Sequence, residues 1–313
     1  MRFLLDEPHS VARKLVGSGA PVYVTVDPIE YHGPHLSLHN DSAISQGFVR
    51  EMHTRLQAEN DWPFLLGGAV DAGADPVPGP GTRPVAPNEV FRRAWDAVRS
   101  VVELGAKRVV LMTFHGSPRH VHAVFRCIRK LERMGIQAFF PTVVLYRTVV
   151  DPDVERLRGV FDRIGDEGVR RQLLERPSCD FHAGFLETSA ALHWAPETVN
   201  RHDLTPPCPQ FEPDRWLSLA ARAAHKAGKV QLGKELRFLS EALGWYRVRP
   251  FPGYSGWPHL ANPEAGELIA RELVGQAVAL AGGVFDGSQR APAPILGWTT
   301  GGRLAGWVNS MSA

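Results

Sequence analysis

Cysteine is scarce in this sequence. Three residues, Cys127, Cys179 and Cys208, are scattered through 313 positions and form no C-x-x-C pair. Their spacing argues against a disulfide framework or a thiolate zinc site, and it fits a reducing cytoplasm. Charge of one sign is also lacking, because 35 basic residues stand against 33 acidic ones. We therefore expect a cytoplasmic protein that does not bind nucleic acid.

Long apolar runs are absent as well. The N-terminus offers only Phe3-Leu4-Leu5 before Asp6, which is too short for the core of a signal peptide. We find no uninterrupted apolar run that approaches membrane-spanning length, and no internal repeat or low-complexity block. The sequence thus predicts no membrane partner.

The elements that the sequence does contain alternate between strands and helices. Apolar β-branched runs predict strands over 21–26, 62–66, 108–114 and 136–145, and periodic patterns predict helices over 1–20, from 42, over 87–104, 119–134 and 263–282. The stretch 67–81 is predicted to be a functional loop, and 214–250 has little to assign. This order favours a three-layer α/β/α fold with a mostly parallel sheet. We expect one domain over 1–285 and a tail over 286–313 that is loosely ordered or packs on a neighbouring subunit.

One short segment gathers polar side chains directly after the first predicted strand. Between Pro28 and Asp41 it holds two carboxylates and three imidazoles: Glu30, His32, His35, His39 and Asp41. Oxygen and imidazole ligands together suit zinc, manganese or iron(II). The alternative is a solvated polar loop whose histidines are incidental.

A second polar turn supports the metal interpretation. His115 follows the predicted strand 108–114. The carboxyl ends of parallel strands share one edge of a sheet, which is where α/β proteins bind ligands. We therefore expect His115 to lie near Glu30 and Asp41.

Four stretches in order resemble the creatininase (creatinine amidohydrolase) family. They are Ile29 to Leu36 (IEYHGPHL) with Asp41, Val110 to Gly116 (VLMTFHG), His182 to Ser189 (HAGFLETS) and Gly253 to Gly266 (GYSGWPHLANPEAG). Each stretch alone is a weak signal, but four in the family order are specific.

The resemblance implies a metal-dependent amidohydrolase that cleaves a C–N bond of a small cyclic amide or N-formyl compound. It implies a first metal at Glu30, Asp41 and His115, and a second at His32, Asp41 and a further carboxylate. It places His182 beside the substrate, where it aids proton transfer. It also implies a homo-oligomer, commonly a hexamer.

The chain departs from the family pattern around the second metal. Ser117 stands where creatininase has a glutamate ligand, Pro118 replaces an amide residue of many relatives, and Phe185 replaces a glutamate. We therefore predict one divalent ion (zinc, manganese or iron) rather than two. His182 is then the general base, together with His32 if no metal takes that imidazole.

Other polar residues near these motifs receive lesser roles. His35 is expected to orient a ligand or the loop. Glu187 is either catalytic support or a buried structural carboxylate, and the structural role is favoured. Spacing does not decide whether His39, His120 or His122 replaces the missing ligand. We expect Asp180, His120 and His122 to be surface residues.

Two other functions are compatible with these departures. The chain could run a different reaction on the same scaffold, such as amide formation or rearrangement. It could also be a non-catalytic homologue with a degenerate second metal site, in which Phe185 or Arg119 fills the space. The hydrolase hypothesis predicts a small-molecule substrate and about one bound ion per chain.

Overall fold

A computed structural model describes residues 3–58 and 60–300 of the chain. The chain groups into two compact units. The first unit comprises Met1–Tyr31, Leu38–Leu145 and Glu272–Thr300, and the second comprises His32–Ser37, Tyr146–Arg271 and Gly301–Ala313. The single domain over 1–285 stays a prediction.

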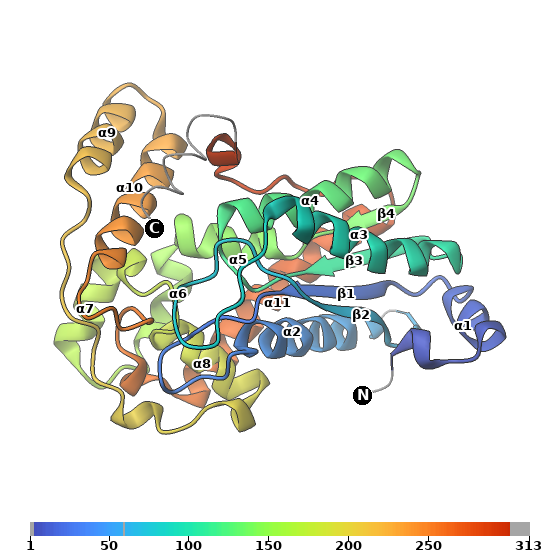
Figure 1. Ribbon diagram of the computed structural model, residues 1–313, viewed down its shortest axis with the longest axis horizontal. Helices are drawn as coiled ribbons and strands as arrows, with labels where there is room; N and C mark the ends of the chain where they lie inside the picture. The colour runs from blue at the N-terminus through green and yellow to red at the C-terminus, as the bar shows by residue number, and fades with distance from the viewer. Residues whose placement is uncertain (1–2, 59, 301–313) are drawn as a thin grey trace. The chain divides into compact units, whose positions relative to one another are not determined.

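The first unit is built on a four-stranded parallel sheet with the order β2-β1-β3-β4. The strands are β1 (Val22–Asp27), β2 (Leu65–Asp71), β3 (Arg108–Met112) and β4 (Gln137–Phe139). Helix α1 (His9–Val16) precedes β1, and the helices between the strands are α2 (Asn40–Gln57), α3 (Pro87–Glu103) and α4 (Pro118–Arg133). This alternation confirms the predicted α/β fold class (Figure 1).

The core of this unit lies between the sheet and its helices. All six residues of β1 are buried, because β1 pairs with β2 on one side and β3 on the other. Helix α2 packs on β1, α3 packs on β1 and β2, and α4 lies beside α3 (Figure 1). A strand buried on both faces reads as a continuous apolar run, which is why β1 and β3 were predictable.

Strand β2 begins three residues later than the predicted strand over 62–66 and continues into the predicted loop. Its centre contains Gly67, where an added Cβ would come within 2.6 Å of Val101 Cγ1 and 2.7 Å of Val22 Cγ1. The glycine therefore allows α3 and β1 to approach the strand closely, and the prediction of a loop in this glycine-rich stretch is wrong over the strand.

The predicted strand over 136–145 is wrong beyond residue 139. Strand β4 has three residues, and helix α5 (Thr142–Val150) follows Pro141. Thr142 Oγ1 donates to Thr113 O at 2.8 Å and accepts from Thr113 N at 3.1 Å, which holds the start of α5 beside the end of β3. A short apolar run does not distinguish a buried strand from a buried helix.

The second unit is mainly helical. It contains α6 (Val154–Phe161), α7 (Glu167–Glu175), α8 (Phe185–Trp194), α9 (Arg215–Lys226), α10 (Val230–Tyr246) and the first part of α11 (Pro263–Phe285). Helices α9 and α10 occupy the stretch that the sequence left unassigned, and they pack on each other (Figure 1). Trp245 of α10 is fully buried and donates from Nε1 to Tyr254 O at 2.8 Å.

Helix α11 is apolar on average, although Glu267 and Arg271 interrupt its sequence, so the statement about uninterrupted apolar runs holds. Its 23 residues have the length and mean hydropathy of a spanning helix, and 44% of the apolar window is buried in the structure. A core helix passes the same test, so this is weak evidence for a membrane span.

The described part of the tail packs on its own chain. The 3-10 turn η6 (Gly297–Thr300) contacts α4, and His122 Nε2 donates to Ile295 O at 3.0 Å. Trp307 and the other residues from 301 onward lie outside the described residues.

Candidate functional site

Two carboxylates and one imidazole meet at the carboxyl edge of the sheet in the first unit. Glu30 lies in the loop after β1, Asp41 in the first turn of α2, and His115 just after β3. Since β1 and β3 are parallel neighbours, their ends emerge side by side. His115 Nδ1 lies 2.8 Å from Glu30 Oε2 and 3.7 Å from Asp41 Oδ2. These three residues therefore lie together, as the sequence predicts.

The backbone of the loop after β2 fixes the orientation of this group. His115 Nε2 lies 3.0 Å from Ala74 O, and because a carbonyl only accepts, Nε2 carries the proton. Val77 N donates to Glu30 Oε1 at 2.6 Å. The remaining imidazole nitrogen, Nδ1, therefore faces the two carboxylates.

The negative charge of two buried carboxylates in this group must be balanced by a cation. Glu30, Asp41 and His115 are all buried. Burial opposes a charged imidazole, but Glu30 and Asp41 outweigh it and raise the pKa of His115 to about 9. Two buried carboxylates thus favour either an imidazolium or a metal ion at Nδ1. Carboxylate oxygens with one imidazole nitrogen fit a zinc or manganese site, so the residues present suit the predicted metal.

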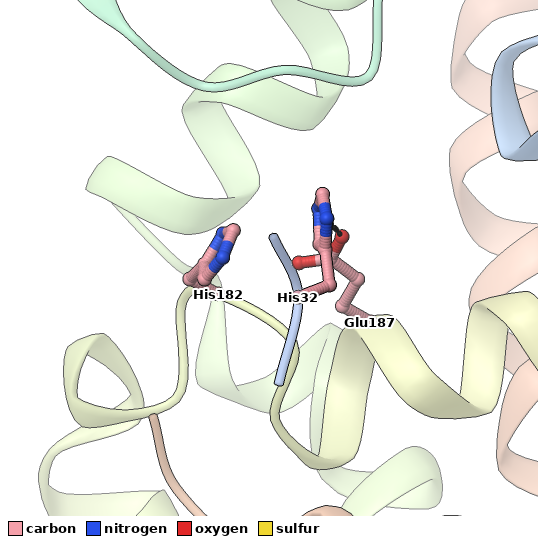
Figure 2. A group of neighbouring side chains, drawn as sticks. All are labelled: His32, His182 and Glu187. Atoms are coloured by element: carbon pink, nitrogen blue, oxygen red, sulfur yellow. Dashed lines mark ion pairs between the residues drawn. The ribbon is translucent and has the colours of Figure 1, made fainter. Parts of the chain in front are cut away.

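A second polar group lies in the second unit. It consists of His32, His182 and Glu187, whose candidate ligand atoms all lie within 4.8 Å of one another (Figure 2). His32 Nε2 is 3.1 Å from Glu187 Oε1, and the rings of His32 and His182 have centroids 4.5 Å apart. Burial alone would raise the pKa of Glu187, but His32 and His182 lower it below its ordinary value. The group therefore holds an ionised carboxylate beside two imidazoles.

The loop that carries His182 is held by two buried side chains. Ser255 Oγ accepts from His182 N at 3.0 Å, and Ser255 N donates to His182 O at 2.8 Å. Asp180 accepts from Phe185 N at 2.7 Å and from Leu186 N at 3.0 Å, which joins the loop to the start of α8. These bonds fix the backbone on both sides of the imidazole.

The expectation that Asp180 and His120 are surface residues is wrong, since both are buried. His120 Nε2 lies 3.0 Å from Thr113 Oγ1 and 3.1 Å from Val26 O, and burial lowers its pKa to about 3. It is a neutral core residue of α4 that packs against His115, with ring centroids 5.0 Å apart. The helical pattern placed His120 correctly on α4, but a single sequence does not show which polar residues face inward.

The other histidines take different places. His39 is half exposed, with Nδ1 3.8 Å from Asp71 Oδ1, and His122 contacts the segment before η6. His35 is buried, with Nε2 3.0 Å from Thr188 Oγ1 at the start of α8, which agrees with a loop-orienting role.

Ser117, which departs from the family pattern, and the nearby Arg119 both contact Asp75. Ser117 Oγ donates to Asp75 Oδ2 at 3.2 Å, and Arg119 Nη1 donates to Asp75 Oδ1 at 2.8 Å. Arg119 is therefore engaged by Asp75, and Phe185 is fully buried at the start of α8.

Glu187 belongs to the second group and lies inside the stretch His182 to Ser189 that resembles the family. The sequence favours a structural carboxylate over catalytic support for it, and that assignment stays a prediction. Its position in the first turn of α8 places its carboxylate beside His32.

Comparison with known proteins agrees with this architecture. The family model for creatininase, described as creatinine amidohydrolase, matches residues 11–281. Among solved structures, "Creatininase Mn" has a TM-score of 0.53 at 20% identity, covering 91% of this chain and 98% of that one. "Crystal structure of creatinine amidohydrolase (creatininase)" has a TM-score of 0.54 at 20% identity, covering 93% and 98%. A putative creatinine amidohydrolase from Bacteroides fragilis NCTC 9343 has a TM-score of 0.57 at 17% identity, covering 85% and 90%.

No curated protein matches the sequence. The solved structures share the fold, and the family model extends over most of the chain. The chain therefore belongs to the creatininase family.

Proposed function

We propose that this protein is a metal-dependent amidohydrolase that cleaves a C–N bond in a small cyclic amide or N-formyl compound. The observation that carries the proposal is the placement of His115 Nδ1 against Glu30 and Asp41 in a buried site. Three ligands of this kind leave a coordination position for water, as catalytic zinc sites do.

The ion would be zinc, manganese or iron, held by Glu30, Asp41 and His115, with one ion per chain. A creatininase structure with manganese and a mutant creatininase structure described as "Zn-Zn type" are among the fold neighbours. When bound, the ion would lower the pKa of a water molecule and polarise the carbonyl of the substrate.

The residues of the second unit would handle the proton. His182 would accept a proton from the attacking water and return it to the leaving nitrogen as the C–N bond breaks. A cyclic amide would then open to a single amino acid, and an N-formyl compound would give formate and an amine. Glu187, held as a carboxylate, stabilises the positive charge that appears on the imidazole pair. His32 either takes part in this proton transfer with His182 or acts as a metal ligand, as the family resemblance implies.

The hypothesis of a non-catalytic homologue is less well supported. It would gain if Arg119 or Phe185 filled the site, but Arg119 is paired with Asp75. A different reaction on the same scaffold is the second candidate, because Ser117 and Pro118 depart from the family pattern.

Metal analysis of the purified protein tests the proposal. We expect about one zinc, manganese or iron per chain in the wild type, and loss of most of that metal in Glu30→Ala and His115→Ala. Asp96→Ala, which removes an exposed carboxylate on α3, is the matched control and should retain the ion.

The same preparations are then assayed against creatinine, small lactams and N-formyl compounds. The expected result is hydrolysis by the wild type and not by His115→Ala, measured as ring opening of creatinine or a lactam, or as release of formate and an amine from an N-formyl compound. A wild type free of metal, with all variants equal in activity, would overturn the hydrolase proposal. Turnover of these compounds without hydrolysis would favour the second candidate.

A further inference from the structure

Helix α9 presents its large apolar side chains to solvent and its small ones to the protein. Ala221 and Ala224 are buried, whereas Trp216 is 73% exposed and Leu219 is 44% exposed. The helix is well formed, since Asp214 Oδ1 accepts from Leu217 N at 2.9 Å at its start. Helices of globular proteins normally bury their larger apolar residues, so this arrangement calls for a partner outside the unit.

The exposed apolar residues form a single stripe. Trp216, Leu219, Ala220 and Ala223 recur at i, i+3, i+4 and i+7, which places them on one side of the helix. All four are exposed. We call this stripe the α9 face.

Cations border the α9 face along one edge. Arg215, Arg222 and Lys226 are exposed and recur at i, i+7 and i+11, so they line up beside the stripe. Among the residues that the structure describes, none of the three forms an ion pair. The helix therefore combines an apolar side with a basic edge.

The rest of the α9–α10 hairpin is also basic at its surface. Residues 214–249 contain eight lysines and arginines and three acids. The acids are all buried: Asp214, Glu235 and Glu241. Asp214 pairs with Arg247 of the hairpin, Glu241 pairs with Arg176 outside it, and Lys234 pairs with Asp151. The charge that the hairpin exposes is consequently positive, and it comes mainly from Arg215, Arg222, Lys226, Lys229 and Arg237.

We propose that the α9 face is a peripheral docking surface for an anionic lipid membrane. A helix with Trp and Leu on one side and Lys and Arg beside them lies in the headgroup region with its apolar side in the acyl boundary. Cations spread along both helices suit an extended negative surface better than a compact acidic site on a protein. A nucleic acid would also engage the cations, but it would leave Leu219 and the alanines against water.

This surface departs from the expectation of no membrane partner. That expectation came from the lack of a signal-peptide core and of an uninterrupted apolar run of membrane-spanning length, and neither signal detects a helix that lies on a membrane surface. The binding is weak and reversible, since two large apolar side chains and a few cations give far less than a spanning helix. It is independent of the proposed hydrolase activity.

Co-sedimentation with vesicles tests the proposal on the full chain. The probes are vesicles of phosphatidylcholine alone and of phosphatidylcholine with about 30 mol % phosphatidylserine. We expect binding to the anionic vesicles only, falling steeply as salt rises from about 0.1 M to about 1 M. Each exposed cation should contribute about fivefold in partitioning, so Arg222→Glu with Lys226→Glu should weaken binding by more than about tenfold.

Two further variants separate the apolar and ionic parts. Trp216→Ala should reduce binding several-fold at equal charge. Lys107→Glu with Arg133→Glu, a matched reversal of exposed cations in the first unit, should leave binding unchanged. Melting temperatures of all variants check that each is folded.

Equal binding to both vesicle types, or none, would overturn the proposal. Loss of binding in the control reversal equal to that in the α9 reversal would do the same. Tighter binding to polyuridylate than to anionic vesicles, with the same dependence on Arg222 and Lys226, would indicate that the α9 face binds a nucleic acid and not a membrane.

Discussion

Glu187 is tied to its surroundings through both carboxylate oxygens. Oε1 lies 3.1 Å from His32 Nε2, and Oε2 accepts from Ala183 N at 2.7 Å. In Glu187→Gln the side chain keeps its shape but loses its charge, so the imidazoles lose the carboxylate that stabilises their protonated form. We predict a fall in kcat of about 10- to 100-fold, as for partners of metal ligands.

Metal content is the readout that separates this role from a structural one. Glu187→Gln should keep the ion at Glu30, Asp41 and His115. Glu197→Gln, an exposed glutamate just after α8, is the matched control. Wild-type kcat in Glu187→Gln would support the structural role that the sequence favours.

His35 makes stability depend on pH. Burial lowers its pKa to about 4, from an ordinary value near 6.5. The unfolded chain therefore binds a proton more readily than the folded one between these values. The stabilising effect of a neutral His35 is complete above pH 6.5 and is lost as the pH falls toward 4, by at most about 3 kcal/mol.

Melting temperatures measured between about pH 7 and about pH 4.5 test this assignment. His35→Gln should melt at a lower temperature than the wild type at neutral pH, because the contact with Thr188 changes. The difference in melting temperature between the two proteins should become smaller in acid, since the variant lacks the titrating group. A difference that is constant over this range would contradict the prediction.

Individual site residues could be predicted from the sequence where a metal-binding side chain also stood at the end of a predicted strand or the start of a predicted helix. Glu30, Asp41 and His115 combined metal-binding side chains with strand ends, and they meet in space. Asp180 and His120 lacked such a signal. Their burial depends on which face of a loop or helix turns inward, and this is decided by packing from elements distant in the sequence.

Among the elements, β2 depends on two adjacent glycines that differ in their surroundings. An added Cβ at Gly67 would lie 2.6 Å from Val101 and 2.7 Å from Val22, whereas one at Gly68 would lie 3.6 Å from Ala97. We predict that Gly67→Ala lowers the free energy of unfolding by about 1–3 kcal/mol through overpacking.

Gly68→Ala is the neighbouring control for that substitution. Its Cβ makes only an ordinary contact, and alanine reduces the entropy of the unfolded chain, so its stability should equal or exceed that of the wild type. Urea denaturation of both variants gives the comparison. Equal destabilisation by both substitutions would show that the effect of Gly67→Ala does not come from the close approach of α3 and β1.

Elements with a strong helical or buried-strand pattern were predictable, as α3 and β3 illustrate. The end of β4 was not, because an apolar run that continues after Pro141 is compatible with strand and helix alike. In the structure the segment is helical, and Thr142 at its start donates to Thr113. That partner is 29 residues away, so the local sequence does not reveal it.

At the scale of the whole molecule, the family resemblance predicts a homo-oligomer, commonly a hexamer. Light scattering during gel filtration should then give a mass near six times 34.5 kDa. A chain ending at Thr300 should assemble less well if residues from 301 onward, including Trp307, pack on a neighbouring subunit. A monomeric mass for the full chain would contradict the assembly, and an unchanged hexamer after truncation would contradict the role of the tail.

The hydrogen bond between His115 and Ala74 has a consequence for how the protein tolerates change. The acceptor is a main-chain oxygen, and it is present whichever amino acid occupies position 74. Exchange of Ala74 for a residue that fits its buried position therefore leaves the protonated nitrogen of the ring where it is. A change in the path of the backbone after β2, such as an insertion, a deletion or a side chain too large for position 74, would turn the other nitrogen toward the carboxylates.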